Sequence, residues 1–259
     1  MTGWNFPSNG GGAINGIADA GVQIFAGKEI PSLARETCQN SLDAAAYENT
    51  AVVVEFERYE ISPKDIPGVR EYEKILRACR TLWKDNVKAE AFITNALLKL
   101  HYDATSVLRI SDFHTTGLAK PYDAFAMEGW NTLTKINGGT TKSDDNAGNF
   151  GIGKNAPFAN SVFRLVFYRT LNEKFDRAAQ GVAKLLSFNL NAQDIAAGTG
   201  YYGETKGSMP APRIPALDKF ISARAEAPTF LSKNRREDSR FYKREMNRRA
   251  SCVLLTIMR

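Results

Sequence analysis

A glycine-rich stretch, GNFGIGKNA at residues 148–156, is the first part of the sequence whose residue types suggest chemistry. It fits two patterns. A phosphate-binding loop of the form G-x-x-x-x-G-K-[ST] would begin at Gly148, with Asn155 in place of the hydroxyl residue. Alternatively, Gly148, Gly151 and Gly153 form G-x-x-G-x-G. A phosphate loop directly follows a buried strand, whose end directs backbone N–H groups at the phosphates. The preceding residues, NGGTTKSDDNA, are too polar for such a strand, so the second pattern is favoured.

A predicted helix upstream carries three polar side chains on one face. Glu36, Asn40 and Asp43 stand at positions i, i+4 and i+7, which brings them to the same side of a helix. Leu33 and Leu42 are expected on the buried side. Carboxylate and amide oxygens suit Mg²⁺, a hard cation that takes few protein ligands and keeps several waters. Taken alone, the pattern also fits an ordinary solvated helix face.

A third candidate is Asp112, the last residue of the strand-like run LRISD, which FHTTGL follows. A carboxylate at the end of a strand can accept a hydrogen bond from the exocyclic amine of adenine. Taken alone, Asp112 is also typical of a turn. The order of the motifs favours a nucleotide site: a polar-faced helix, a strand-end aspartate, a long polar segment and then the glycine pattern.

The spacing of apolar residues places these motifs on alternating helices and strands. Helices are expected at 14–27, 31–49, 69–83, 87–102 and 121–135, with another beginning near 155, and strands at 51–61, 106–112, 162–170, 181–190 and 251–258. Residues 115–153, apart from the short helical piece at 121–135, and residues 198–215 are expected as loops. A polar connection as long as the first is unusual unless it is a lid or a binding loop.

Composition bounds the class of protein. The chain has 259 residues, of which 43% are hydrophobic and 24% are charged, which is ordinary for a globular domain. It has no apolar run of the roughly 18 residues that a membrane helix needs, and no secretory signal is expected. Three scattered cysteines and two histidines argue against a disulfide framework, a zinc site or a histidine metal cluster. We therefore expect a cytoplasmic protein with no membrane segment.

The net charge of +6 is concentrated near the C-terminus. Between Arg224 and Arg249 the chain has nine Lys or Arg residues and four Asp or Glu residues. Such a tract can bind the phosphate backbone of nucleic acid, and it can equally be a solvated helix.

The ordered motifs resemble those of the GHKL ATPases, the superfamily of gyrase B subunits, ninety-kilodalton heat-shock chaperones, histidine kinases and MutL proteins. The E-x-x-x-N-x-x-D-A motif of that family is matched by Glu36, Asn40, Asp43 and Ala44, and its G-x-x-G-x-G motif by the three glycines above. The D-x-G-x-G motif is matched only in part, because one residue is inserted after Asp112 and the first glycine is missing. The resemblance covers residues 14–190 and looks nearest to the MORC-like, MutL and gyrase B types.

The resemblance implies a Bergerat ATP-binding fold, an α+β two-layer sandwich of helices on a mixed, mostly antiparallel sheet. Residues 14–259 would form this single domain, with a lid at about 115–153 and the basic segment at 224–249, after a flexible N-terminal arm at 1–13. ATP and Mg²⁺ are the implied cofactors. Glu36 would be the catalytic residue and Asn40 the metal ligand, and the nucleotide-binding residues would be Asn40, Asp43, Asp112, Thr116, Gly117, Gly148, Gly151, Ile152, Gly153 and Lys154.

The implied function is slow Mg-dependent ATP hydrolysis that drives a conformational switch, in DNA transactions or phage defence. Glu36 favours hydrolysis, since a carboxylate can orient or deprotonate the attacking water. Two alternatives remain: a regulatory module that binds ATP without hydrolysing it, and a phosphotransferase of the histidine-kinase type. A homodimer, or a partner subunit that supplies a second domain, is also implied.

Overall fold

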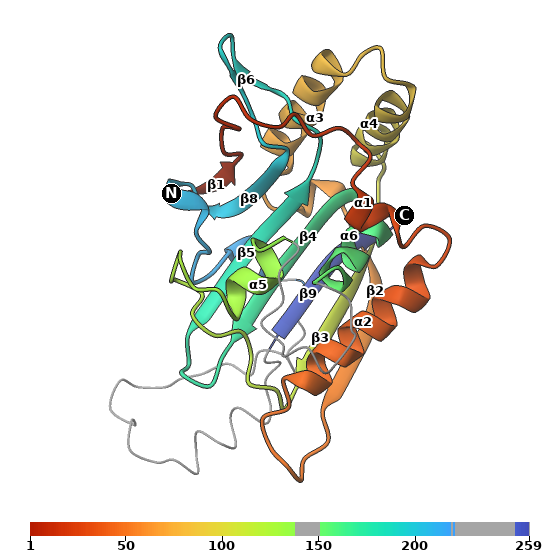
Figure 1. The fold of residues 1–259 in the computed structure, drawn as a ribbon. Coiled ribbons are helices and arrows are strands. Elements are labelled where there is room, and N and C mark those ends of the chain that lie inside the picture. The colour runs from red at the N-terminus through yellow and green to blue at the C-terminus, as the bar shows by residue number, and fades with distance from the viewer. Residues whose placement is uncertain (138–150, 219, 221–251, 259) are drawn as a thin grey trace.

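A seven-stranded sheet forms the centre of the protein (Figure 1). The computed structural model describes residues 1–137, 151–218, 220 and 252–258. The strand order is β1-β8-β5-β4-β9-β3-β2, and every described pair of neighbours is antiparallel. The strands, in sheet order, are Thr2–Asn5, Thr199–Glu204, Arg177–Lys184, Ser161–Leu171, Cys252–Met258, Thr105–Phe113 and Val53–Ile61. A small separate sheet pairs β6 (Asn189–Asn191) with β7 (Asp194–Ile195).

Helices cover both faces of the sheet. They are α1 (Ala20–Gln23), α2 (Glu29–Asp43), α3 (Val69–Leu82), α4 (Val87–Leu100), α5 (Trp130–Thr134), α6 (Ala156–Asn160) and α7 (Pro215–Asp218), with 3-10 turns at Pro63–Asp65, Gly153–Asn155 and Lys206–Ser208. Successive residues of a strand point to opposite faces. On β4, Leu165 and Phe167 join the core beneath α3 and α4, whereas Val166 and Tyr168 join the core beneath α2, α5 and α6.

The class is thus α+β with an antiparallel sheet, as expected. The helices α3 and α4 pack on the face of the sheet opposite α2, α5 and α6. The apolar periodicity of α3 and α4 places Tyr72, Leu76 and Ile93 in that core, each at most 1% exposed. Ends of elements follow local signals: Asn86 caps α4 by accepting a hydrogen bond from Ala89 N at 3.0 Å.

The N-terminal residues are the main correction to the predicted elements. They were expected as a flexible arm, but Thr2–Asn5 pair with β8 as an edge strand. Trp4 is 6% exposed, and its ring packs against those of Phe6, Tyr72 and Tyr202. Burial of these aromatic rings holds the segment in place.

Further expectations were wrong. The predicted loop at 198–215 contains the strand β8 (Thr199–Glu204), and the predicted helix at 14–27 is reduced to Ala20–Gln23. The helix predicted at 121–135 is reduced to α5 (Trp130–Thr134), and the strand predicted at 181–190 begins earlier, as β5 (Arg177–Lys184). The other long elements were confirmed with shifted ends, including the pairing of β4 with β5. In the described part of the chain, no helix is long and apolar enough to cross a membrane.

Candidate functional site

The helix α2 brings Glu36 against the glycine segment. Leu33, which is 1% exposed, anchors the helix on the sheet. Glu36 lies one turn further along, and its side chain is only 12% exposed. Its Oε1 accepts a hydrogen bond from Nη2 of the exposed Arg35 at 2.7 Å. A Cβ added at Gly153 would lie 2.8 Å from Glu36 Cδ and closer still to Oε2. The carboxylate therefore lies directly on the backbone of Gly153.

The glycine segment around position 153 is a tight turn that leads into α6. Gly151 has a φ of +67°, a left-handed conformation that suits glycine, and Gly153 begins the 3-10 turn Gly153–Asn155. Ile152 packs against the core beneath α2 and thereby holds the turn on the sheet. Gly148, the first glycine of the predicted motif, lies outside the described residues.

Asn40 is exposed although it points to the sheet side of α2. It follows Leu33 by seven residues, so at about 100° per residue the two side chains are only about 20° apart around the helix axis. Leu33 is buried and Asn40 is exposed, so the space in front of Asn40 is open to solvent. Asp43, the third residue of the predicted polar face, is also exposed, and its Oδ1 accepts from Gln39 Nε2 at 2.7 Å.

Leu42 does not face the core as expected. It is 59% exposed, and the buried neighbour is Ser41, at 3%. Leu42 follows Leu33 by nine residues, which places it about 180° away around the helix. Ser41 uses its buried hydroxyl to donate to Asp112 Oδ2 at 3.1 Å.

Asp112 lies beneath α2, on the same face of the sheet. It pairs in register with Val54 on β2, and Thr115 donates its hydroxyl to the second carboxylate oxygen at 3.0 Å. The strand runs one residue beyond Asp112, to Phe113. Ser41 and Thr115 were not among the predicted site residues. The only feature of the sequence that could have indicated them is that each side chain carries a hydroxyl group near a predicted site residue. The two hydroxyls hold the carboxylate in a defined orientation.

The loop after β3 is fastened to the end of α2 and to β4. Thr116 N donates to Ala44 O at 2.8 Å. Gly117 has a φ of +67°, and a Cβ there would lie 2.7 Å from Leu171 O. Only glycine fits this close approach of two backbones. The partial motif around Asp112 therefore forms an ordered turn beside the helix, despite its inserted residue.

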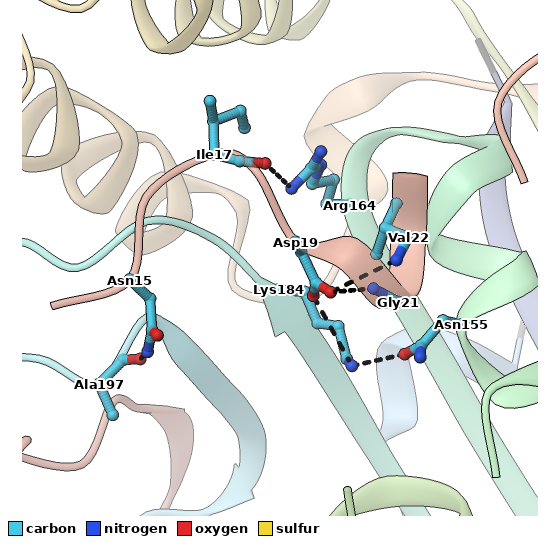
Figure 2. Close-up of polar contacts among 9 residues, drawn as sticks. All are labelled: Asn15, Ile17, Asp19, Gly21, Val22, Asn155, Arg164, Lys184 and Ala197. Atoms are coloured by element: carbon cyan, nitrogen blue, oxygen red, sulfur yellow. Dashed lines mark hydrogen bonds and ion pairs between the residues drawn. The ribbon is translucent and has the colours of Figure 1, made fainter. Parts of the chain in front are cut away.

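Two lysines lie at the glycine segment, Lys154 within it and Lys184 on β5 beside Asn155. Lys154 Nζ donates to Thr132 O at 3.0 Å. Figure 2 shows the second lysine, Lys184, whose Nζ donates to Asn155 Oδ1 at 2.5 Å. Burial, and then the positive charge of Lys184, lower the pKa of Lys154 to about 8. No carboxylate in the described ranges forms an ion pair with Lys154. Its ammonium group is thus partly buried against the Thr132 carbonyl, without a carboxylate to neutralise it.

No protein-family model, curated protein or solved structure matches this chain. The function must therefore be argued from the geometry. Of the predicted site residues, Glu36, Ile152, Gly153 and Lys154 meet at the glycine turn, and Asp112, Thr116 and Gly117 lie at the other end of α2. Asn40 lies between the two groups. The basic tract Arg224–Arg249 lies outside the described residues.

Proposed function

We propose that this protein binds ATP with Mg²⁺ between α2 and the glycine turn and hydrolyses it slowly. The contact between the Glu36 carboxylate and the Gly153 backbone carries the proposal. Two segments far apart in the sequence meet there without any side chain between them. A bare backbone beside a carboxylate suits a phosphate group that must be approached closely and attacked by water.

The open space in front of Asn40 supports binding of a metal–phosphate group. Asn40 lies between Glu36 and Ser41 around the helix, and therefore between the glycine turn and Asp112. Among the residues described, no cluster of three or more His, Cys, Asp or Glu residues could hold a metal ion. The donor set fits Mg²⁺ bound to phosphate, which keeps its waters and needs few protein ligands. Asn40 would supply an amide oxygen, and the bound ion would neutralise phosphate charge.

Asp112 supports recognition of a base with an exocyclic amine. Both its carboxylate oxygens accept hydrogen bonds from hydroxyls, those of Ser41 and Thr115. A carboxylate oxygen can accept more than one hydrogen bond, so an adenine amine can add to this arrangement. The ordered turn at Gly117 gives the base a fixed edge beside Asp112.

Glu36 would orient the attacking water or accept its proton, and Lys154 would face the phosphates. General-base catalysis of this kind contributes about 100-fold or more to a rate. The nucleotide would act as a conformational switch, with its phosphates at the glycine turn and its base at Asp112, at the other end of α2. The resemblance to GHKL ATPases agrees with these assignments, and action on DNA and dimerisation are parts of the same proposal.

The test compares nucleotide binding with turnover. We expect the wild type to bind MgATP in calorimetry and to release phosphate in a malachite-green assay. Glu36→Gln should bind MgATP but lose turnover by about 100-fold or more, whereas Asn40→Ala should lose binding that depends on Mg²⁺. The control is Glu48→Gln, which alters an exposed carboxylate in the turn after α2.

Three results would change the proposal. Full turnover by Glu36→Gln would refute the catalytic role of Glu36. Bound but intact ATP in the wild type would favour the regulatory module, and labelled protein would favour phosphotransfer. Faster phosphate release with duplex DNA would support action on nucleic acid.

A further inference from the structure

Lys184 is a nearly buried cation at the end of β5, on the sheet face that α2 and α6 cover. Its side chain is 12% exposed, and its ammonium group lies 5.3 Å from the centre of the Phe158 ring. Two polar groups face it: Asn155 Oδ1, a hydrogen-bond acceptor at 2.5 Å, and Asp19 Oδ2, at 4.0 Å (Figure 2). A buried ammonium group must be paired, so this arrangement is specific.

Asn155 connects Lys184 to the glycine turn. It is the last residue of the 3-10 turn Gly153–Asn155, and it is 7% exposed. Its amide also lies against α1, because a Cβ at Gly21 would come within 2.6 Å of Asn155 Nδ2. Asn155 therefore has a fixed side chain, with Lys184 on one side and the backbone of α1 on the other.

Asp19 connects Lys184 to the segment before α1. Its Oδ1 accepts from Gly21 N at 2.9 Å and from Val22 N at 3.3 Å and so caps the short helix. Two residues earlier, Ile17 O accepts from Nη1 of the buried Arg164 on β4 at 2.9 Å (Figure 2). The segment is thus attached to β4 through Ile17 as well as to Lys184 through Asp19.

We propose that Lys184 is a positioning residue of the nucleotide site. Through Asn155 it holds the turn that carries Lys154, and through Asp19 it joins that turn to the segment before α1. The assignment rests on the proposed function, because the turn matters to a ligand only if a phosphate binds there. The proposal adds Lys184, a residue of β5 that belongs to none of the three sequence motifs, to the residues of the site.

The proposed role of Lys184 predicts a measurable change in how MgATP affinity depends on pH, through the pKa of Lys154. Lys184 on β5 is the charged neighbour that lowers the pKa of Lys154, and the charges of Asp19 before α1 and Arg164 on β4 act on Lys184 itself. Burial and the charge of Lys184 lower the pKa of Lys154, so loss of the Lys184 charge raises that pKa. Lys154 attracts phosphate only while it is protonated, so affinity for MgATP should fall as the pH rises above about 8. Without the Lys184 charge, this fall should move to higher pH.

The first experiment measures MgATP affinity by calorimetry between pH 6.5 and 9.5 for the wild type, Lys184→Met and Lys184→Arg. We expect Lys184→Met to bind about tenfold more weakly at pH 7, as the loss of one charge-assisted contact implies. Lys184→Arg should recover part of the affinity. The control is Lys206→Met, an exposed lysine. Wild-type affinity in Lys184→Met, or an unmoved pH profile, would overturn the assignment.

The second experiment needs no nucleotide. Hydrogen exchange of the amides at 19–22 and 153–156 should become faster in both segments when Lys184→Met or Asn155→Ala breaks the link. Asn155→Ala serves alone if Lys184→Met does not fold. If the wild type fails to bind MgATP but both segments respond, the proposed function is wrong and the link stands. If MgATP binds and residues 19–22 do not respond, the link is wrong.

Discussion

At the scale of the residue, position 153 is where the glycine turn meets the Glu36 side chain of α2. The Glu36 carboxylate occupies the volume that any side chain on Gly153 would need. Ile152 holds the turn in the core beneath α2 and Leu33 holds the helix there, so the overlap can be relieved only by rotation of the flexible Glu36 side chain. A side chain added at position 153 should therefore either lower the stability of the fold or displace the Glu36 carboxylate.

Gly153→Ala tests this contact. We expect the free energy of unfolding to fall by no more than about 1–3 kcal/mol, the usual cost of an extra methyl group in a packed site, and by less if the Glu36 side chain rotates away. In a Glu36→Ala background the same change should cost much less, because the overlapping carboxylate is gone. Thermal or urea unfolding of the four proteins gives the coupling energy. A coupling energy near zero would mean that the contact does not exist in solution.

The sequence predicted some of these residue positions and missed others for identifiable reasons. The spacing of Glu36 and Asn40 places both on the side of α2 that faces the sheet and the turn. The burial of Leu42 was predicted wrongly, although its phase relative to Leu33 already indicated the opposite face. Ser41 could not be predicted, since a small hydroxyl residue is buried here only because Asp112 accepts its hydrogen bond.

At the scale of the element, long and strongly periodic segments were predictable and short ones were not. The helices α3 and α4 and the strands β2 and β3 have regular apolar spacing, which tertiary contacts reinforce. The strand β8 was missed because of its glycines. Gly200 and Gly203 are required by close neighbours, the Phe6 ring and Met209 O, and not by a turn. The segment before α1 is held by contacts with strands, among them the bond from Arg164 to Ile17 O.

The N-terminus of α4 offers a test of one local signal. Asn86→Ala should lower the free energy of unfolding by about 1 kcal/mol, because the Ala89 N–H loses its acceptor at the helix N-terminus. The matched control is Asn95→Ala, an exposed position within the same helix, which should be neutral or slightly stabilising. Equal effects of the two changes in urea unfolding would show that the cap contributes nothing.

At the scale of the whole molecule, the edge strand β1 joins the N-terminus to the core on the α3 face. Trp4 donates its backbone N–H to Glu71 Oε2 at 3.1 Å and its indole N–H to Gly68 O at 3.2 Å. These bonds connect the strand to the start of α3. The first residues are rich in glycine, and this composition predicted a flexible arm. Composition does not reveal that two aromatic side chains of the segment, Trp4 and Phe6, are buried in a core formed by residues far along the chain.

Trp4→Ala should therefore destabilise the entire fold. We expect a loss of about 3–5 kcal/mol in the free energy of unfolding, the usual cost of removing a large aromatic side chain from a core. Phe125→Ala is the control, since Phe125 is 92% exposed and its loss should change stability little. If the two variants melt at the same temperature in calorimetry, β1 is not part of the folded core.

The place of β9 in the sheet has a consequence for biosynthesis. This strand lies between β3 and β4, yet the ribosome makes it after every other strand of the sheet. Until it leaves the exit tunnel, the nascent chain has two incomplete half-sheets, and β3 and β4 each have an unpaired edge. Such edges invite pairing with other chains. Cotranslational folding must therefore stop at separate halves, and chaperones that shield exposed strands should matter most in the interval before β9 joins them.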